Sequence, residues 1–257
     1  MSGAPEGVAG NSGLSLPEGL PNSVQVGLED FCAAARSALG DDLRSLVLFG
    51  SAVEARMGAT SDVNLLHVLR SFEPVRVNAI RESLRIAAAA IRLQTMFIVE
   101  DELQLAAESF AVKFEDILYR RHVIYGSDPF AGLTIPPEMI KHRLRQVLLN
   151  LALRLRATYV RFSPHDERLL REIAEAAAPL QACAHAILVL EGRAAPSGKE
   201  ALQQLATELP GDWQKDLEIV SVARQRAVLP PGASSSLLLR LIDLSAALRD
   251  RADSVRL

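Results

Sequence analysis

The chain of 257 residues is long for one domain and short for three, so we expect two domains, each large enough to bury a hydrophobic core. Hydrophobic residues make up 49% and aromatic residues 5% of the chain, and its second half is rich in Leu, Ala and Arg, which is typical of helix-rich cytosolic proteins. A formal net charge of −3 excludes a global attraction to nucleic acid, so any such contact would need a local basic surface.

The cysteines and the terminal segment concern the cellular compartment. Cys32 and Cys183 are far apart and have apolar neighbours, so buried thiols are expected rather than a disulfide or a metal pair. The first residues lack the basic start and apolar core of a signal peptide, and no apolar run reaches the roughly 18 residues of a membrane span. We therefore expect a soluble, cytoplasmic protein without a membrane partner.

The N-terminal segment is followed by one clear helix. Residues 1–22 are rich in Gly, Ser and Pro without apolar periodicity, which predicts a disordered or loosely attached arm. Ser23 is then a candidate N-cap of an amphipathic helix that Gly40 ends. The apolar positions of this helix recur at steps of three and four residues: Val24, Leu28, Phe31, Cys32, Ala35 and Leu39.

The rest of the first half predicts a small sheet. The continuous apolar runs 46–49 and 63–69 are typical of strands buried on both faces, and 50–57 can form a helical turn or two between them. Pro74 predicts the start of a helix through about residue 94, and 95–99 leads into a short helix near Asp101. The alternation of large apolar and polar residues over 110–117 predicts a third strand.

The second half predicts only helices. Proline and glycine clusters separate helical patterns at about 138–161, 165–192, 198–208, 212–226 and 234–253. The predicted fold class is therefore α+β, with a mixed sheet and flanking helices over 23–130 and an all-α helical bundle over 136–257.

Chemistry is concentrated where the first strand ends. Gly50 lets a backbone come close to a ligand and Ser51 offers a hydroxyl and an N–H, which suits a phosphate group, although most Gly-Ser pairs are plain turns. Asp62 and Asn64 are two residues apart on the next strand, so both side chains point to one face. Oxygen ligands at this place are what a Mg²⁺-dependent phosphoryl or nucleotidyl transfer site needs.

These segments resemble the nucleotidyltransferase superfamily related to DNA polymerase beta, whose signature is Gly-Ser, a spacer of about ten residues and Asp-x-Asp on the next strand. The stretches FAVKFEDILYRRHVIYGSDPF and AILVLEGRAAPSGKEALQQLA extend the resemblance to a group of bacterial nucleotidyltransferase-domain proteins. Their helical C-terminal half is like that of kanamycin nucleotidyltransferase. The resemblance implies a nucleotide, with ATP the first candidate, in a cleft between the two domains, Mg²⁺ as cofactor, and contacts from Gly50, Ser51 and Asp62.

The departures from that signature predict an impaired metal site. Asn64 stands where the resemblance implies a second metal carboxylate, and Lys113 where it implies the third. A lysine ammonium about 4 Å from a metal ion opposes its binding by roughly 4 kcal/mol per unit charge at an effective dielectric of 20. Glu115, two residues further along the predicted strand, is a displaced substitute, and Lys113 could instead bind nucleotide phosphate. Arg56 is a further candidate for phosphate or for solvent.

Three functions follow as alternatives. The first is a nucleotidyltransferase-like pseudoenzyme that binds nucleotide or a partner, with Asp62 as a weak metal ligand. The second is an active Mg²⁺-dependent enzyme that moves a nucleoside monophosphate to a hydroxyl of a small molecule, RNA or protein, with Asp62, Asn64 and Glu115 as ligands. The third is an inert fold whose helices form a homodimer or hold a protein partner.

Other residues favour structural roles. His67 is expected to be a packed histidine, and Asp116 points away from Lys113 on the predicted strand. The basic residues of 141–161 form either a solvated helix face or a contact for RNA or substrate. A HEPN-like bundle has an Arg followed by a His in its RNA-cleaving members, but Arg161 and His165 are at a helix break, so we reject a ribonuclease.

Overall fold

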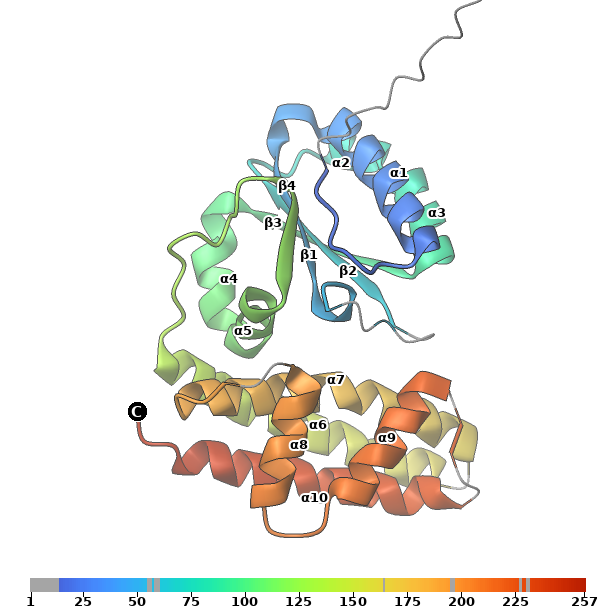
Figure 1. The fold of residues 1–257 in the computed structure, drawn as a ribbon, viewed down its shortest axis with the longest axis vertical. Coiled ribbons are helices and arrows are strands. Elements are labelled where there is room, and N and C mark those ends of the chain that lie inside the picture. Colours follow the sequence, from blue (N-terminus) through green and yellow to red (C-terminus); the bar gives the residue numbers. More distant parts are fainter. Residues whose placement is uncertain are drawn as a thin grey trace, which may run out of the picture. The chain divides into compact units, whose positions relative to one another are not determined.

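The computed structural model describes residues 14–54, 57, 61–163, 165–194, 197–226, 228–229 and 232–257, in two compact units that are treated separately below (Figure 1). The first unit takes in the described residues up to Glu54 together with Ser61–Asp101 and Arg120–Ala131. The second takes in Glu102–Tyr119 and the described residues from Gly132 onward. Residues 102–119 therefore belong with the helical half, whereas the sequence places them with the sheet.

Helix α1 (Asn22–Leu39) of the first unit has the apolar face that its sequence predicts. Its buried residues are Val24, Leu28, Phe31, Cys32, Ala35 and Leu39. Gly40, with φ of 51°, follows the last turn, in a left-handed conformation that glycine adopts without the steric cost of a side chain. The predicted cap is wrong: the helix begins at Asn22, and the Pro21 carbonyl accepts from the N–H of Val24.

The sheet has four strands in the order β3-β2-β1-β4. Strands β1 (Leu43–Phe49) and β2 (Val63–Leu69) are antiparallel neighbours at its centre, and the predicted buried runs are confirmed. Strand β3 (Leu93–Val99) pairs parallel to β2, whereas β4 (Arg121–Gly126) pairs antiparallel to β1. Helices α2 (Pro74–Ala79) and α3 (Arg81–Ile91) form the crossover that a parallel pair requires, and α1 and α3 cover one face (Figure 1).

Two predictions between residues 74 and 119 are wrong. The predicted helix to residue 94 ends at Ile91, and the next residues form β3. The strand predicted over 110–117 is helix α5 (Ala111–Tyr119), which follows α4 (Leu103–Ser109). The buried residues of α5, Ala111, Val112, Phe114 and Ile117, have helical spacing, whereas Phe110 of the apparent alternation is 48% exposed.

The second unit is helical, as predicted. Besides α4 and α5 it contains α6 (Pro137–Phe162), α7 (Asp166–Leu190), α8 (Gly198–Glu208), α9 (Gln214–Arg226) and α10 (Ala233–Ser254). Helices α6, α7 and α10 run alongside one another, and α8 and α9 pack against α7 (Figure 1). The α+β fold class is confirmed.

Helix α7 is the central element of this helical core. It buries Leu169, Ile173, Leu180, Cys183 and Ile187, among others. By length and composition it could cross a membrane, but 56% of its most apolar window is buried inside the protein, as in the core helix of a soluble protein. The cytoplasmic location stays a prediction.

Part of the predicted N-terminal arm is attached to the sheet. The Ser15 N–H donates to the Ile124 carbonyl of β4, at 3.0 Å, and the side chain of Leu20 is buried. The prediction of a disordered arm is therefore wrong for residues 14–21, while residues 1–13 lie outside the described part of the chain.

His67 of β2 is a packed histidine, as expected. Its ring is fully buried, stacked on Phe97 of β3 at a centroid distance of 4.4 Å and edge-on to Phe31 of α1 at 5.6 Å. Neither ring nitrogen makes a hydrogen bond of good geometry with a described residue, and the nearby Met96 backbone opposes the effect of burial only in part. Burial therefore lowers the pKa of His67 to about 4.

Candidate functional site

The Gly50-Ser51 turn forms directly after β1. Gly50 has φ of 81°, a left-handed conformation that strains any other residue. Its N–H donates to the Arg120 carbonyl at 3.0 Å, and its carbonyl accepts from the Val53 N–H at 3.1 Å. The turn is a single 3₁₀ element, Gly50–Ala52, and the candidate Arg56 lies outside the described residues.

Asn64 approaches this turn, and Asp62 contacts Asn64 through its backbone carbonyl. Asn64 is the register partner of Phe49 across the β1-β2 ladder, so it faces the end of β1. A Cβ added to Gly50 would lie 3.5 Å from Asn64 Nδ2. The same amide nitrogen donates to the Asp62 carbonyl at 3.4 Å. The first unit therefore brings Gly50, Asp62 and Asn64 together at one end of the sheet.

Strand β3 adds two residues that the sequence analysis missed. Gln94 is the parallel register partner of Asn64, and partners in adjacent strands point to the same face. One step before that strand, Arg92 donates from Nε and Nη2 to Asp62 Oδ1, at 3.0 and 2.8 Å. The sequence does not reveal strand β3 and these two residues, because residues 81–94 have a helical apolar pattern and no glycine marks the end of the helix.

Lys113 and Glu115 are on helix α5 of the second unit, not on a strand of the sheet. The inference that Lys113 takes the third carboxylate position relied on a strand at 110–117, and that strand is absent because the segment is helical. Residues two apart on a helix point to different sides, so Glu115 does not share a face with Lys113 either. Burial raises the pKa of Glu115. Within the sheet, the neighbour of Asn64 on the adjoining strand is Gln94.

Comparisons with known proteins place the fold. No protein-family model matches the chain, and no curated protein matches it. Among solved structures, it is similar to a spectinomycin adenyltransferase from Enterococcus faecialis that was crystallised with ATP and spectinomycin, with a TM-score of 0.56 over 86% of this chain and 99% of that chain. The chain has a nucleotidyltransferase-like fold. At 14% identity, the likeness concerns the fold alone.

The starts of β2 and β3, where the sequence predicts a weak metal ligand at Asp62, are the place to test for Mg²⁺. The side chains there are one carboxylate, Asp62, two neutral amides, Asn64 and Gln94, and the guanidinium of Arg92. Mg²⁺ requires hard oxygen ligands, mainly carboxylates, in near-octahedral geometry. Across the described residues, no group of three or more His, Cys, Asp or Glu could hold a metal ion. This donor set does not fit Mg²⁺.

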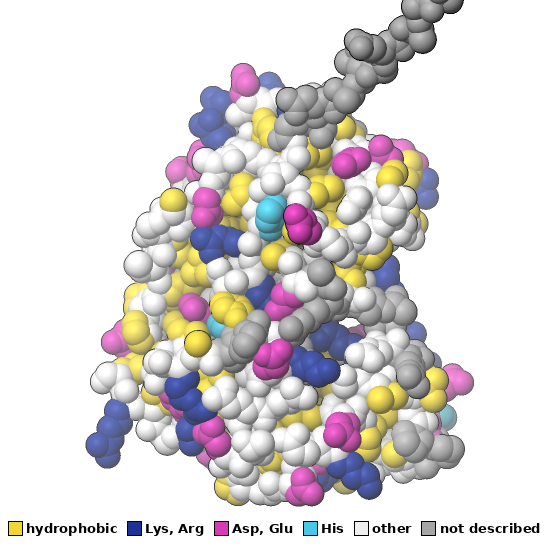
Figure 2. Space-filling model, viewed as in Figure 1, with side chains coloured by type: hydrophobic (Ala, Val, Ile, Leu, Met, Phe, Trp, Pro, Cys, Tyr) yellow, Lys and Arg dark blue, Asp and Glu magenta, His cyan; other side chains and the backbone are white. Residues whose placement is uncertain are grey.

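Several basic residues of α6 have acceptors within their own unit. Lys141 Nζ donates to the Asp253 carbonyl at 3.0 Å and to the Val255 carbonyl, and Arg145 pairs with the Asp253 side chain. Arg154 is 3.8 Å from Glu172. Figure 2 shows basic and acidic side chains interspersed over one face of the protein. These contacts favour the solvated, internally paired helix face over an RNA contact.

Proposed function

We propose that this protein binds a nucleoside triphosphate, with ATP the first candidate, beside Gly50, Ser51 and Asp62, and transfers little or no nucleotide. One observation carries the proposal. The carboxylate of Asp62, just before β2, is paired with Arg92, and the nearby positions at the starts of β2 and β3 are the amides Asn64 and Gln94. Nucleotidyl transfer relies on metal ions that bridge phosphate oxygens, and this charge pattern opposes them.

The choice of ligand has separate support. The nucleotidyltransferase-like fold is shared with a spectinomycin adenyltransferase that was crystallised with ATP. The glycine with positive φ, the serine after it and the guanidinium of Arg92 are groups that suit a phosphate. An active Mg²⁺-dependent enzyme has less support, because Glu115, its third ligand, is on helix α5.

A transfer assay tests the catalytic half of the proposal. The protein is incubated with α-labelled nucleoside triphosphates, Mg²⁺ or Mn²⁺, and small-molecule, RNA or protein acceptors. We expect no labelled product, because the site lacks the carboxylates that would seat the metal. The matched variants are Asp62→Ala and Asp30→Ala, the latter at an exposed position of α1. Turnover that Asp62→Ala abolishes and Asp30→Ala preserves would contradict the proposal and establish the active enzyme.

Titration calorimetry tests the binding half. We expect ATP to bind the unmodified protein, and Ser51→Ala to weaken that binding by about tenfold, the value of one hydrogen bond to a charged group. Ser37→Ala, on the exposed side of α1, is the control and should bind as the parent does. If no nucleoside triphosphate binds with or without metal, the proposal fails. The alternative of a fold that binds no nucleotide and forms a homodimer or holds a protein partner then replaces it.

A further inference from the structure

Arg92 has a backbone conformation that is unusual for an arginine. It follows the last residue of α3 with φ of 54° and ψ of 39°, and among the described residues it is the one non-glycine with positive φ. Its N–H donates to the Ala87 carbonyl, which closes the helix, and its carbonyl accepts from the Val63 N–H at 3.3 Å, which starts the β2-β3 ladder. This position normally favours Gly or Asn, because their cost in the left-handed region is low.

The side chain of Arg92 is directed at Asp62, the residue just before β2. Nε and Nη2 both donate to Asp62 Oδ1, at 3.0 and 2.8 Å, while the two side chains stay 56% and 41% exposed. An ion pair this exposed contributes little to stability. A strained backbone retained for a weakly stabilising contact indicates a role in binding.

The formal charges of the four side chains at the starts of β2 and β3 sum to zero. Asp62 and Arg92 carry opposite formal charges, and Asn64 and Gln94 are neutral. A divalent ion at Asp62 would have to displace a guanidinium and would then find amide oxygens where it prefers carboxylates. A phosphate group meets the reverse situation, because a guanidinium has five N–H donors in a planar fork that matches its oxygens.

We propose that Arg92 takes the place of the divalent cation at Asp62, so that the site accepts the phosphate groups of a nucleoside triphosphate in their metal-free form. The phosphate part rests on the proposed function, whereas the exclusion of the metal does not. Arg92 neutralises Asp62 through two of its N–H groups and offers other donors of the fork to an incoming oxyanion. Metal would then compete with the protein for the phosphate oxygens.

The first experiment uses Mn²⁺ without nucleotide, followed by electron paramagnetic resonance. One variant restores carboxylates through Asn64→Asp and Gln94→Glu, and a second adds Arg92→Gly to them. We expect the variant that keeps Arg92 to bind Mn²⁺ at least about tenfold more weakly, because a fixed cation opposes the ion. Arg92→Asn, which also suits the left-handed backbone, replaces Arg92→Gly if the latter unfolds.

Two outcomes of the Mn²⁺ experiment would overturn the proposal. Equal Mn²⁺ affinity with and without Arg92 means that the guanidinium does not take the place of a cation. Absence of Mn²⁺ binding in every folded variant means that this end of the sheet is not a cation position at all. Circular dichroism establishes folding for each variant before titration.

The second experiment measures ATP binding in EDTA and in Mg²⁺ by calorimetry. We expect the unmodified protein to bind at least as well in EDTA, Arg92→Gly to lose about tenfold, and Arg92→Lys to lose most of that, because it keeps the charge without the fork. The control is Arg85→Ala on the preceding helix α3, where the Arg85 side chain is 71% exposed beside Glu82. It should bind as the parent does.

The two proposals fail in different ways. ATP binding that Arg92→Gly leaves unchanged, or that requires Mg²⁺, overturns the role of Arg92 and leaves the proposed function standing. Absence of ATP binding under every condition overturns the proposed function and the phosphate role together, while the Mn²⁺ titration still decides whether Arg92 excludes a metal.

Discussion

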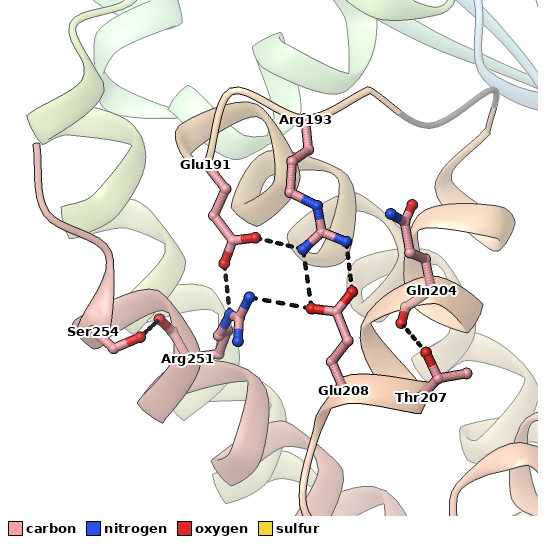
Figure 3. A network of polar contacts seen from close by, with 7 residues as sticks. All are labelled: Glu191, Arg193, Gln204, Thr207, Glu208, Arg251 and Ser254. Carbon is pink, nitrogen blue, oxygen red and sulfur yellow. Dashed lines mark hydrogen bonds and ion pairs between the residues drawn. The ribbon is translucent and has the colours of Figure 1, made fainter.

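Arginine–carboxylate pairs occur in both units, as a closed ring of four side chains in the second unit and as a single pair in the first. In the second unit, Glu191, Arg193, Glu208 and Arg251 form a ring in which every side chain contacts two opposite charges (Figure 3). Their side chains are only 13–33% exposed. In the first unit, Asp62 and Arg92 form a single exposed pair. Closure with burial is typical of structural charges, whereas an open pair keeps donors for a ligand.

The pKa directions agree with this difference. Burial tends to raise the pKa of Glu191, but hydrogen bonds from Arg251 and Arg193 outweigh it and hold the pKa below its usual range. Hydrogen bonds from Arg193 likewise lower the pKa of Glu208. The ring therefore joins the end of α7, the end of α8 and the last turns of α10 more firmly when both glutamates are ionised.

The largest expected effect comes from opening the ring. Glu191→Ala leaves Arg193 and Arg251 without one of their two partners, and losing two hydrogen bonds between charged, partly exposed side chains costs about 2 to 3 kcal/mol. Denaturant unfolding at neutral pH measures the loss. Glu175→Ala, on the helix α7 that Glu191 follows, is the matched control. Glu175 is 52% exposed and 3.9 Å from Arg154, so its loss should cost about 0.5 kcal/mol or less. Equal losses for the two variants would remove the distinction between closed and open pairs.

His67 of the first unit provides a contrast with the charged ring of the second unit, because it is a buried titratable group that stays neutral. Its pKa in the folded protein is about 4, against 6.5 for an unperturbed histidine. Between these values the unfolded state binds the extra proton, so stability falls as pH falls. The folded protein should lose about 2 kcal/mol through His67 alone on going from pH 7 to pH 5.

A variant isolates this contribution from the carboxylates that titrate at lower pH. His67→Phe keeps a ring between Phe31 and Phe97 and removes the ionisable group. Unfolding free energies measured at both pH values should fall by about 2 kcal/mol less in the variant than in the parent. Parallel pH profiles for the two proteins would mean that the pKa of His67 is the same in the folded and the unfolded state.

The elements that sequence could predict are those with an unbroken local pattern. The face of α1, strand β2 and helices α6 to α10 repeat their apolar spacing over several turns or a full buried run. The sequence does not predict strand β3, because an apolar pattern continues from α3 across Arg92 and the glycine that usually marks the end of a helix is missing. Helix α5 was read as a strand because Phe110, Val112 and Phe114 alternate by chance.

The same division holds for the candidate site. The sequence allows a prediction of Gly50, Ser51, Asp62 and Asn64 as candidates, because these residues lie in two short local segments whose residue types suggest phosphate and metal binding. The Arg92–Asp62 pair joins residues 30 positions apart, through a parallel pairing that no local pattern contains. The cation predicted at the site was Lys113, but Lys113 is on a helix, and the cation that contacts Asp62 is Arg92.

The smallest expected effect concerns the open pair itself. Arg92→Gly removes an exposed ion pair of about 0.5 kcal/mol and relieves a left-handed backbone that costs an arginine about 1 kcal/mol, a gain that the greater freedom of glycine in the unfolded chain partly offsets. Stability should therefore change by less than about 1 kcal/mol in either direction. Arg85→Gly, in the interior of α3, also removes an exposed pair but places glycine in a helix, and should cost about 1 kcal/mol. Denaturant unfolding of both variants gives the contrast. A loss above about 2 kcal/mol for Arg92→Gly would make the pair structural, like the ring of the second unit, and would leave the strained backbone explained by stability rather than by a ligand.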